Sequence, residues 1–321
     1  NTANFMRVLI TGAAGNLVTM LGQYLLSTTD HFLNLMIHRT PVSRGLEREG
    51  RTRVYRCDLA DPATLSAVCR DSEAVVHFAG VLFAPNPERF LPTTNLLYTR
   101  HLVDEALAAE TKRFILVSFP HVEGPTSRED PCTDRQDRQP ISVHAQTRLA
   151  AEKYLIERAK GSSMRAISLR PGMIYGKGVL MVAYAKQLAQ RRLLGIWRPP
   201  TPIHLLSIDD FNACCRAAIE QPEATGIYAL GDDAPTTLQK FLDTACKHWS
   251  VKRPWRVPVW SVYVVAWLCE TFAKLFRTRT PFTVDFIRIG RVPYYCDTLR
   301  MKRELLPSLR YRSLQEGVDI L

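Results

Sequence analysis

Short apolar segments alternate with helix-like segments through the first half of the chain, and this alternation constrains the fold more than any other feature. The apolar runs occupy residues 6–11, 32–38, 53–58, 73–80, 112–119 and 164–171. Helical spacing of apolar residues fills about 16–26, 62–70, 89–109 and 142–155. Apolar strands separated by helices are typical of a parallel sheet that is buried on both faces. The sequence therefore predicts an α/β fold with a doubly wound parallel sheet.

The second half of the chain is less regular. Helices are expected near 179–193, 208–220, 236–248 and 258–276, and short strands near 203–207, 226–230 and 293–296. We therefore predict two parts. Residues 1–171 form the sheet domain, and residues 172–321 form a smaller, mixed α/β lobe that binds substrate, with some exchange of strands and helices between them. A long loop rich in Pro, Asp, Arg and Thr, about 120–140, separates two of the predicted elements.

Charge is distributed unevenly along the 321 residues. The formal net charge is +11, and residues 251–321 hold thirteen Lys and Arg against six Asp and Glu, a local excess of +7. A basic lobe suits an anionic ligand or surface, although a basic exterior also serves solubility alone. The chain has no compact Lys/Arg run and no known nucleic-acid motif, so a nucleic-acid partner is not expected.

The eight cysteines lie scattered in apolar segments, without a C-x-x-C pair or zinc spacing. This pattern favours buried thiols in a reducing compartment and no metal site, and with no signal peptide visible it predicts a cytoplasmic protein. The longest apolar run, residues 257–269, is too short to span a bilayer. It favours a core or pocket helix over a helix at the membrane surface, so membrane association is not expected.

A glycine-containing turn follows the first predicted strand. In TGAAGNLV, residues 11–18, Gly12 and Gly15 have the spacing of a tight strand-to-helix turn. Such a turn directs backbone N–H groups and a helix N-terminus at a pyrophosphate. Its position between the first strand and the first helix makes the motif specific, and indicates a Rossmann-type dinucleotide site. The predicted contacts are Gly12, Ala14, Gly15, Asn16 and Leu17.

Several further motifs resemble the extended short-chain dehydrogenases/reductases, in particular the atypical members of the NAD(P)-dependent epimerase/dehydratase type. TGAAGNLV is similar to that family's TGxxGxxG, with Val18 at the third glycine, and PIHLLSIDDF (202–211) to a late V-H-V-D-D segment. CDL (57–59), VVHFAG (75–80), Asn95 and RPGMIYGKG (170–178) also match family segments. The resemblance implies cofactor contacts by Asp58, Leu59, Phe78, Ala79, Gly80, Asn95, Pro171, Met173 and Ile174.

The residues after the second strand bear on the choice of dinucleotide. An NAD enzyme places an acidic residue there to bind the ribose 2′-hydroxyl. This chain has His38 and Arg39, with Arg44 further on. Cations suit a 2′-phosphate, so we expect NADP as the cofactor and NAD as the second choice. The alternative is that Arg39 is only a surface charge at the end of a strand.

The resemblance also locates the catalytic positions. Family members carry a Ser, a Tyr and a Lys, with the last two spaced Y-x-x-x-K on a helix. HAQTR places His144 at the Tyr and Arg148 at the Lys, and SFPHVEG (118–124) places Phe119 at the Ser. His144 titrates near neutrality, whereas Arg148 can hold ribose hydroxyls but cannot carry a proton. A neighbouring Arg favours a neutral imidazole. Further catalytic candidates are Ser118, His121 and Tyr175.

These observations favour an NAD(P)-binding epimerase/dehydratase-like or oxidoreductase enzyme with a replaced Ser-Tyr-Lys triad. Aromatic residues near 255–267 and the basic lobe fit an apolar or anionic carbonyl or alcohol, a small molecule, with a nucleotide sugar also open. Two alternatives remain: a non-catalytic NADP(H) sensor or scaffold, and a non-redox lyase or isomerase that uses His144 or His121. The resemblance implies a homodimer, paired through the helices near 89–109 and 142–155.

Overall fold

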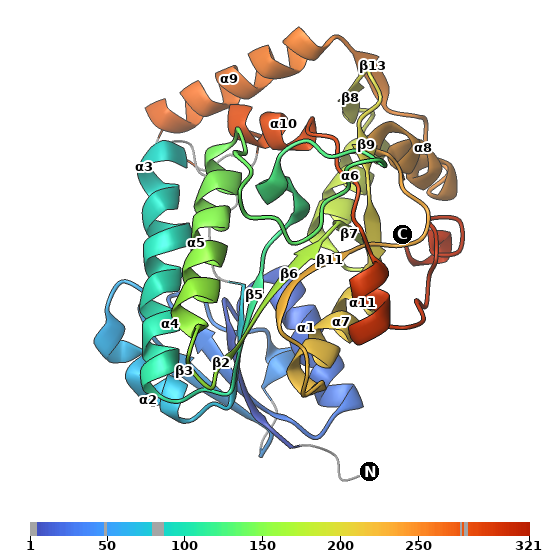
Figure 1. Ribbon diagram of the computed structural model, residues 1–321. Coiled ribbons are helices and arrows are strands. Elements are labelled where there is room, and N and C mark those ends of the chain that lie inside the picture. Colours follow the sequence, from blue (N-terminus) through green and yellow to red (C-terminus); the bar gives the residue numbers. More distant parts are fainter. Residues whose placement is uncertain (1–4, 48–49, 79–86, 277, 279–281) are drawn as a thin grey trace.

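A seven-stranded parallel sheet forms the centre of the protein (Figure 1). The computed structural model describes residues 5–47, 50–78, 87–276, 278 and 282–321. The strand order is β11-β6-β5-β4-β1-β2-β3, and every neighbouring pair runs parallel. The bounds are β1 Arg7–Thr11, β2 Phe32–Ile37, β3 Thr52–Arg56, β4 Ala74–His77, β5 Arg113–Val117, β6 Arg165–Pro171 and β11 Gly226–Leu230. The predicted doubly wound α/β fold is confirmed.

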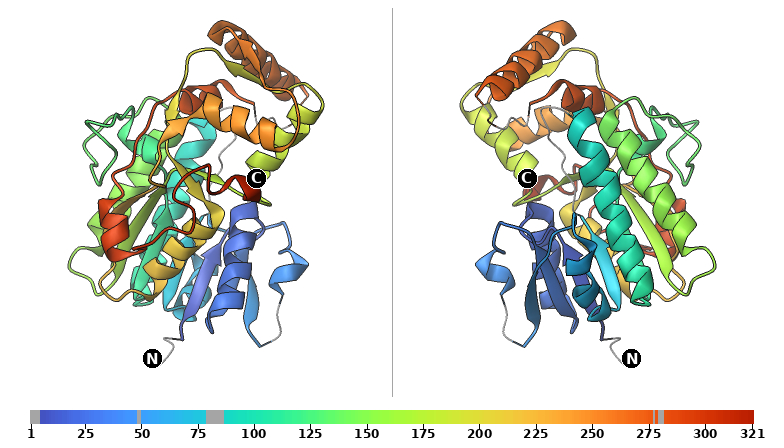
Figure 2. Two further views of the ribbon diagram at one scale, coloured as in Figure 1. Left: turned by 90° about the vertical axis from the view of Figure 1, so that its right-hand side faces the viewer. Right: turned by 90° about the vertical axis from the view of Figure 1, so that its left-hand side faces the viewer.

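Helices cover both faces of this sheet (Figures 1 and 2). On one face lie α2 (Ser66–Arg70), α4 (Tyr98–Ala108) and α5 (Val143–Ala159), whose apolar side chains share a buried cluster with Leu9, Val75 and Phe114. On the other face lie α1 (Asn16–Thr28) and α7 (Ile208–Glu220), packed in the larger cluster. Both sheet faces are apolar at the centre because β1, β4 and β5 carry runs of Val, Ile and Leu.

The helix expected over residues 89–109 contains an irregular turn. It forms α3 (Pro87–Leu91), a π-helical turn at Pro92–Leu97, and then α4. The π turn begins at a proline, which supplies no backbone N–H to the preceding turn. Asn95 is the buried residue of this turn. Single π turns are frequent at functional sites, and this one sets the direction of the Asn95 side chain.

The C-terminal part contributes to the sheet domain as well as to a separate lobe. β11 adds the edge strand beside β6, and α7 packs on the sheet. The lobe contains β7 (Met173–Tyr175), α6 (Leu180–Gln190), β8 (Gly195–Trp197), β9 (Pro202–Ile203), β10 (Leu205–Ser207), β12 (Thr236–Thr237), α8 (Leu238–His248), β13 (Trp255–Val257), α9 (Val259–Leu275), α10 (Val284–Gly290) and α11 (Leu299–Glu304). The division at residue 171 stays a prediction.

Two predictions for this lobe are wrong. The strand expected near 293–296 is reduced to one bridge between Cys132 and Cys296, because this extended segment pairs with the irregular loop and not with a strand. The core position expected for α9 is wrong, because the helix buries only Val262, Ala266 and Ala273 and leaves much of its apolar surface exposed, whereas its role in a substrate pocket stays a prediction. Among the described residues, no helix is long and apolar enough to cross a membrane.

A buried ionic cluster connects β6, α5 and the loop after β5. The guanidinium of Arg170, in β6, forms ion pairs with both Glu123 and Glu152, and all three side chains are fully buried. Arg170 also donates to the carbonyl oxygens of Thr133 (3.2 Å) and Arg135 (2.9 Å). The Glu123 carboxylate accepts from the backbone N–H groups of the same two loop residues. The cluster therefore fixes an otherwise irregular loop against the helix that carries the candidate catalytic residues.

Replacing Arg170 with Leu should destabilise the fold strongly, because two buried carboxylates would lose their cation. We expect a loss of about 3–5 kcal/mol in the free energy of unfolding, measured by urea denaturation. The matched control is Arg165→Leu on the same strand, whose partner Glu223 is exposed and 3.7 Å away. That change should cost less than about 1 kcal/mol. Equal losses in the two variants would contradict the role of the cluster.

Candidate active site

The glycine turn has the geometry of an anion site. Gly12 has φ of 69°, a conformation that L-residues other than Gly rarely adopt, and the Gly15 N–H donates to the Gly12 carbonyl at 2.8 Å. A Cβ on Gly15 would lie 3.1 Å from that carbonyl oxygen. No side chain caps the N-terminus of α1, and its first turn carries no acidic residue. The positive end of the helix dipole is therefore available to a phosphate.

Neighbouring residues tie this turn to the second half of the chain. The Asn16 side chain donates to the Gly178 carbonyl and accepts from the Leu180 N–H, each at 2.9 Å. Ala14 is exposed beside the turn, and Leu17 packs partly against the core. Asn16 thus brings the segment after β7 to the edge of the predicted pyrophosphate site.

The residues predicted to select the dinucleotide lie at the ends of β2 and β3. His38 and Arg39 are both exposed just after β2. The His38 Nε2 atom lies 3.6 Å from the Asp58 carboxylate. Asp58 also accepts from the Ala60 N–H at 2.9 Å, and the Leu59 carbonyl lies 2.8 Å from His101 Nδ1. The structure therefore brings the predicted His38 and Asp58 together and leaves Arg39 open to solvent.

A row of buried polar side chains runs from β1 to α5. His77, at the end of β4, lies between the Thr11 hydroxyl (2.8 Å) and the Thr99 hydroxyl (3.0 Å). Thr99 donates to the Asn95 carbonyl at 2.8 Å. The Asn95 amide nitrogen then lies 3.1 Å from His144 Nδ1. This row links the strand that precedes the glycine turn to the candidate catalytic histidine.

The backbone of Phe78 is hydrogen-bonded to this row of polar side chains, because its N–H donates to the Thr11 hydroxyl at 3.2 Å. The predicted contacts Ala79 and Gly80 lie outside the described residues. Burial together with the charge of Arg148 lowers the pKa of His77 to about 3. His77 is therefore neutral and acts as a fixed connector in the row.

His144 is held as a neutral imidazole. Its side chain is buried, and its ring lies 4.9 Å from the ring of Phe119. Burial, followed by the charges of Arg148 and His121, lowers its pKa to about 3. An amide nitrogen can only donate, so the Asn95 contact makes Nδ1 the acceptor and leaves the ring proton on Nε2. His144 is accordingly suited to donate a hydrogen bond and unsuited to act as a strong acid.

Arg148 lies one helical turn after His144, and its side chain is buried. Among the described residues, its Nη1 atom has no hydrogen-bond partner. Burial lowers the pKa of Arg148 to about 10, although the charge of Glu152 opposes the shift, so the side chain stays cationic at neutral pH. A buried cation with a free donor is costly unless a ligand pairs with it. The Ser118 hydroxyl, also buried, lacks a partner in the same way.

Phe119 takes part in a chain of four rings. His121 lies 5.1 Å from Phe119 and 4.6 Å from Tyr294, between ring centroids. Burial lowers the pKa of His121 to about 4 and raises the pKa of the Tyr294 phenol. Sequence reasoning missed Tyr294, since its segment was assigned to a strand with no site role. Only the proximity of two chain segments 173 residues apart reveals it.

The catalytic candidate Tyr175 lies against the C-terminal lobe. Its ring is fully buried against Phe241 of α8, with the hydroxyl directed at the backbone of Gly317. Burial raises the pKa of this phenol. The strand pairing of β7 with β10 directs the side chain into the C-terminal lobe, away from the Phe119–His144 contact. The described contacts therefore place the Tyr175 phenol beside Phe241 and Gly317, and its catalytic role stays a prediction.

The segment after β6 lies at the junction of the two parts. Pro171 ends β6, and Met173 and Ile174 are half-buried in β7. From α10, the buried Asp285 carboxylate interacts with the backbone N–H groups of Val143 and His144, at the start of α5. The C-terminal lobe therefore caps the helix that carries His144, a contact that no motif in the sequence indicated.

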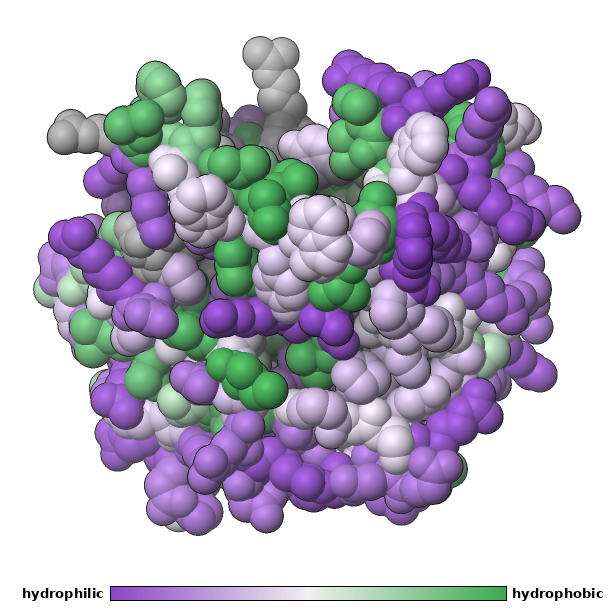
Figure 3. Space-filling view, turned by 90° about the horizontal axis from the view of Figure 1, so that it is seen from above, coloured by the Kyte–Doolittle hydropathy of each residue, from purple (hydrophilic) through white to green (hydrophobic). Residues whose placement is uncertain are grey.

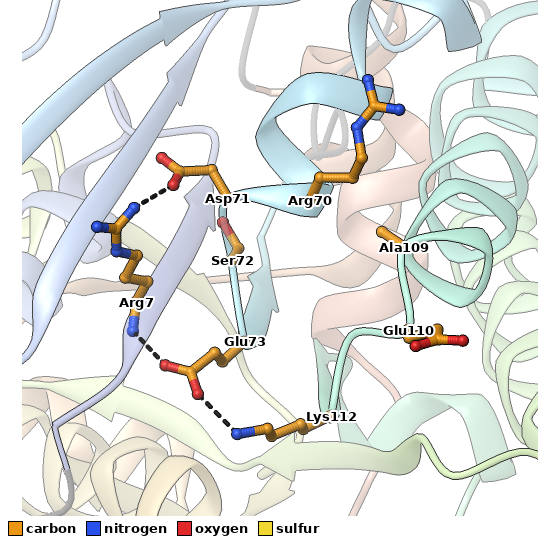
Figure 4. A pocket seen from close by; sticks show the side chains of 8 residues that line it. All are labelled: Arg7, Arg70, Asp71, Ser72, Glu73, Ala109, Glu110 and Lys112. Carbon is orange, nitrogen blue, oxygen red and sulfur yellow. Dashed lines mark hydrogen bonds and ion pairs between the residues drawn. The ribbon is translucent and has the colours of Figure 1, made fainter.

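A polar hollow of about 310 Å³ lies elsewhere on the surface (Figure 4). It is lined by Arg7, Arg70, Asp71, Ser72, Glu73, Ala109, Glu110 and Lys112. Four of its charged side chains already pair with one another: Arg7 with Asp71, and Lys112 with Glu73 at 2.7 Å. These residues lie where the strands begin, whereas ligands of doubly wound sheets bind where the strands end. The hollow is therefore not the candidate active site.

Comparison with known proteins agrees with this geometry. The family model for the NAD dependent epimerase/dehydratase family matches residues 8–231. A UDP-glucose 4-epimerase of Vibrio cholerae is 25% identical over 280 residues, covering 84% of this chain and 82% of that protein. A uronate dehydrogenase of Pseudomonas syringae pv. tomato is 25% identical over 232 residues, covering 71% and 76%.

Solved structures share the fold. MoeE5 in complex with UDP-glucuronic acid and NAD superimposes with a TM-score of 0.76 at 18% sequence identity, covering 98% of this chain and 97% of that one. At this identity the likeness shows the fold alone. Because the family model spans more than half of the chain, the protein belongs to the NAD-dependent epimerase/dehydratase family. The resemblance inferred from the sequence motifs is confirmed.

The low pKa of His144 predicts a pH dependence of stability. A histidine with a pKa of about 3 in the fold and about 6.5 unfolded takes up a proton on unfolding, so its contribution is present above pH 6.5 and lost as the pH falls toward 3. The slope is about 1.4 kcal/mol per pH unit. His144→Gln should remove this slope between pH 6 and 4, as measured by urea denaturation across that range.

His121→Gln serves as the comparison, because the pKa of His121 is lowered only to about 4. Its difference from the wild type should level off near pH 4, whereas that of His144→Gln should continue to lower pH. Parallel stability curves for the wild type and His144→Gln would show that His144 is not held neutral.

Proposed function

We propose that the protein is an NAD(P)-dependent enzyme that interconverts a carbonyl and an alcohol, with Phe119, His144 and Arg148 in place of the usual Ser-Tyr-Lys triad. The observation that carries the proposal is the Nη1 atom of Arg148, a buried cationic donor without a partner among the described residues, one turn from a neutral histidine. A structural arginine would be paired, as Arg170 is. An unpaired one fits a ligand site.

The residues fit a nicotinamide dinucleotide. The uncapped N-terminus of α1 and the Gly12–Gly15 turn would hold its pyrophosphate, and Arg148 would bind ribose hydroxyls. When bound, this cofactor supplies a hydride acceptor or donor. The exposed Arg39 and His38, at the end of β2, support NADP, since a guanidinium pairs well with a 2′-phosphate. The NAD in MoeE5 supports the unphosphorylated form as the second choice.

His144 would act on the substrate oxygen as a neutral donor. With Nδ1 held by Asn95, the Nε2–H is free to donate, and the nearby Arg148 cation favours negative charge that develops on that oxygen. A neutral imidazole can polarise a carbonyl without giving up its proton completely. Preorganised donors of this kind are worth about 2.7–4 kcal/mol each in other enzymes. Proton delivery would then fall to another group, with His121 the neighbouring candidate.

The substrate proposed is a small carbonyl or alcohol with an apolar or anionic part. The excess of +7 in residues 251–321 favours an anionic group. The relatives support this direction, because they include a uronate dehydrogenase and a structure with UDP-glucuronic acid. The ring chain from His144 to Tyr294 supplies the apolar part of the proposed pocket.

A second candidate is a dinucleotide-binding protein without turnover. The observation in its favour is the replacement of both usual side chains that contact the substrate oxygen: Phe119 stands at the position of the serine, and His144 at that of the tyrosine. This candidate predicts cofactor binding that is independent of His144. Screening aldehydes, ketones, uronic acids and nucleotide sugars for oxidation or reduction with the bound cofactor separates the two functions.

Replacing Arg148 with Met should weaken dinucleotide binding. Loss of a hydrogen bond from a charged donor costs about 1.5–3 kcal/mol, equivalent to roughly a 10- to 100-fold rise in Kd for NADPH and NADH, measured by calorimetry. Arg148→Lys should recover part of the affinity, since it keeps the cation. Arg158→Met is the control on the same helix, because Arg158 is half exposed and paired with Asp104. Unchanged affinity in Arg148→Met would overturn the assignment.

Two substitutions of His144 separate hydrogen-bond donation from proton transfer. His144→Ala should lower kcat by about 100- to 1,000-fold on a substrate identified by the screen. His144→Gln should retain more of the activity, because its amide can donate a hydrogen bond but cannot carry a proton. If His144→Gln is as inactive as His144→Ala while both bind cofactor normally, His144 transfers a proton in the reaction.

A further inference from the structure

An exposed apolar helix face lies on the C-terminal lobe, at the end of the molecule above the carboxyl ends of the sheet (Figures 1 and 2). α9 spans Val259–Leu275, and eight large apolar side chains on it and at its end are exposed. We name these the α9 apolar face: Trp260, Val264, Val265, Trp267, Leu268, Phe272, Leu275 and Phe276. The side chain of Leu275 is 75% exposed and that of Trp260 is 69% exposed, so neither belongs to the buried core.

The residues of the α9 apolar face share one side of the helix. Positions 260, 264, 268, 272 and 275 recur at the spacing of three or four residues that aligns side chains. The opposite side carries Val262, Ala266 and Ala273, which are buried against the protein. Seen from above, apolar side chains gather on this end of the molecule among charged ones (Figure 3). A contiguous face of this kind is typical of an interaction surface.

The exposed charges of the segment that contains α9 have one sign. Among described residues 251–291, every exposed ionic side chain is a cation, namely Lys252, Arg253, Lys274, Arg288 and Arg291. The acidic Glu270 is only partly exposed and accepts from the Val284 N–H at 2.8 Å. Asp285, in α10, is buried against the first residues of α5. The partner must therefore combine apolar surface with negative charge.

A second group of exposed basic and aromatic side chains lies beside this helix. Trp255, in β13, is 64% exposed, and its indole N–H donates to the Arg192 carbonyl at 2.9 Å. Arg191, Arg192 and Leu193 are exposed at the end of α6. β13 pairs with β8, which contacts α9, so this group is attached to the same end of the lobe.

We propose that the α9 apolar face docks on an anionic lipid membrane, with α9 lying in the plane of the interface. Its 17 residues are too few to cross a bilayer, but an apolar face with a basic border is the pattern of interfacial helices. Tryptophan prefers the level of the headgroups, where its ring is apolar and its N–H is hydrated. The proposal is independent of the proposed function.

A second copy of this chain fits the face less well. A symmetric dimer would bring the same patch of both copies together, so the cations around one patch would lie close to the cations around the other. Like charges across an interface cost several kcal/mol. An anionic bilayer instead gains from each Lys or Arg near its surface by about 1 kcal/mol.

The test is flotation of the full chain with lipid vesicles. Vesicles of phosphatidylcholine alone are compared with vesicles that contain one third phosphatidylglycerol. We expect at least tenfold more binding to the anionic vesicles, reduced by added salt. Trp260→Gln with Trp267→Gln should lower that binding at least tenfold. The control is Leu299→Gln, at a 74% exposed leucine on α11, which should bind as the wild type does.

The charge contribution is tested with Lys252→Glu and Arg253→Glu together, which should abolish the preference for anionic vesicles. Circular dichroism checks that each variant is folded. Equal binding to the two kinds of vesicle would overturn the proposal, as would no binding to either. In the latter case, a dimer of the wild type in solution that dissociates in the double tryptophan variant would assign the face to a second copy.

Discussion

The buried ion cluster around Arg170 is the interaction on which the rest of the site depends. A cation on β6 meets one carboxylate on α5 and another in the loop after β5, with all three side chains fully buried. Such a cluster is stable only when the hydrogen-bonding groups are satisfied, and here Ser168, Thr133 and Arg135 complete it. It fixes the rotation of α5 about its axis, and hence the direction of His144 and Arg148.

The two buried arginines Arg170 and Arg148 differ in how their charges are paired. Arg170 is paired with two carboxylates, so its contribution is structural. Burial alone would lower its pKa, but the charges of Glu152 and Glu123 raise it overall. Arg148, one helical turn from Glu152 on α5, has a buried donor with no partner among the described residues. Burial lowers the pKa of both His77 and His144, and the charge of Arg148 adds to that shift. The family position for a lysine therefore holds a cation that helps to keep the surrounding imidazoles neutral.

The sequence predicted the sheet domain well because each element there has its own signal: an apolar run, a glycine turn or a helical period. It also placed Asn95, His144 and Arg148 on one site through motif spacing. It failed where the outcome depends on distant contacts. Tyr294 was brought in from 173 residues beyond His121, and α9 was left exposed although it is the most apolar run.

The central claim is that His144 is a neutral imidazole with its proton on Nε2, kept neutral by burial and the charge of Arg148, and held in that tautomer by Asn95. Nitrogen-15 NMR of the histidine rings at pH 7 tests it most directly, because the two ring nitrogens report protonation separately. The account predicts a protonated Nε2 and an unprotonated Nδ1 for His144, and a doubly protonated ring only after Arg148→Met and acidification. A ring protonated on both nitrogens at pH 7, or on Nδ1 alone, would contradict it.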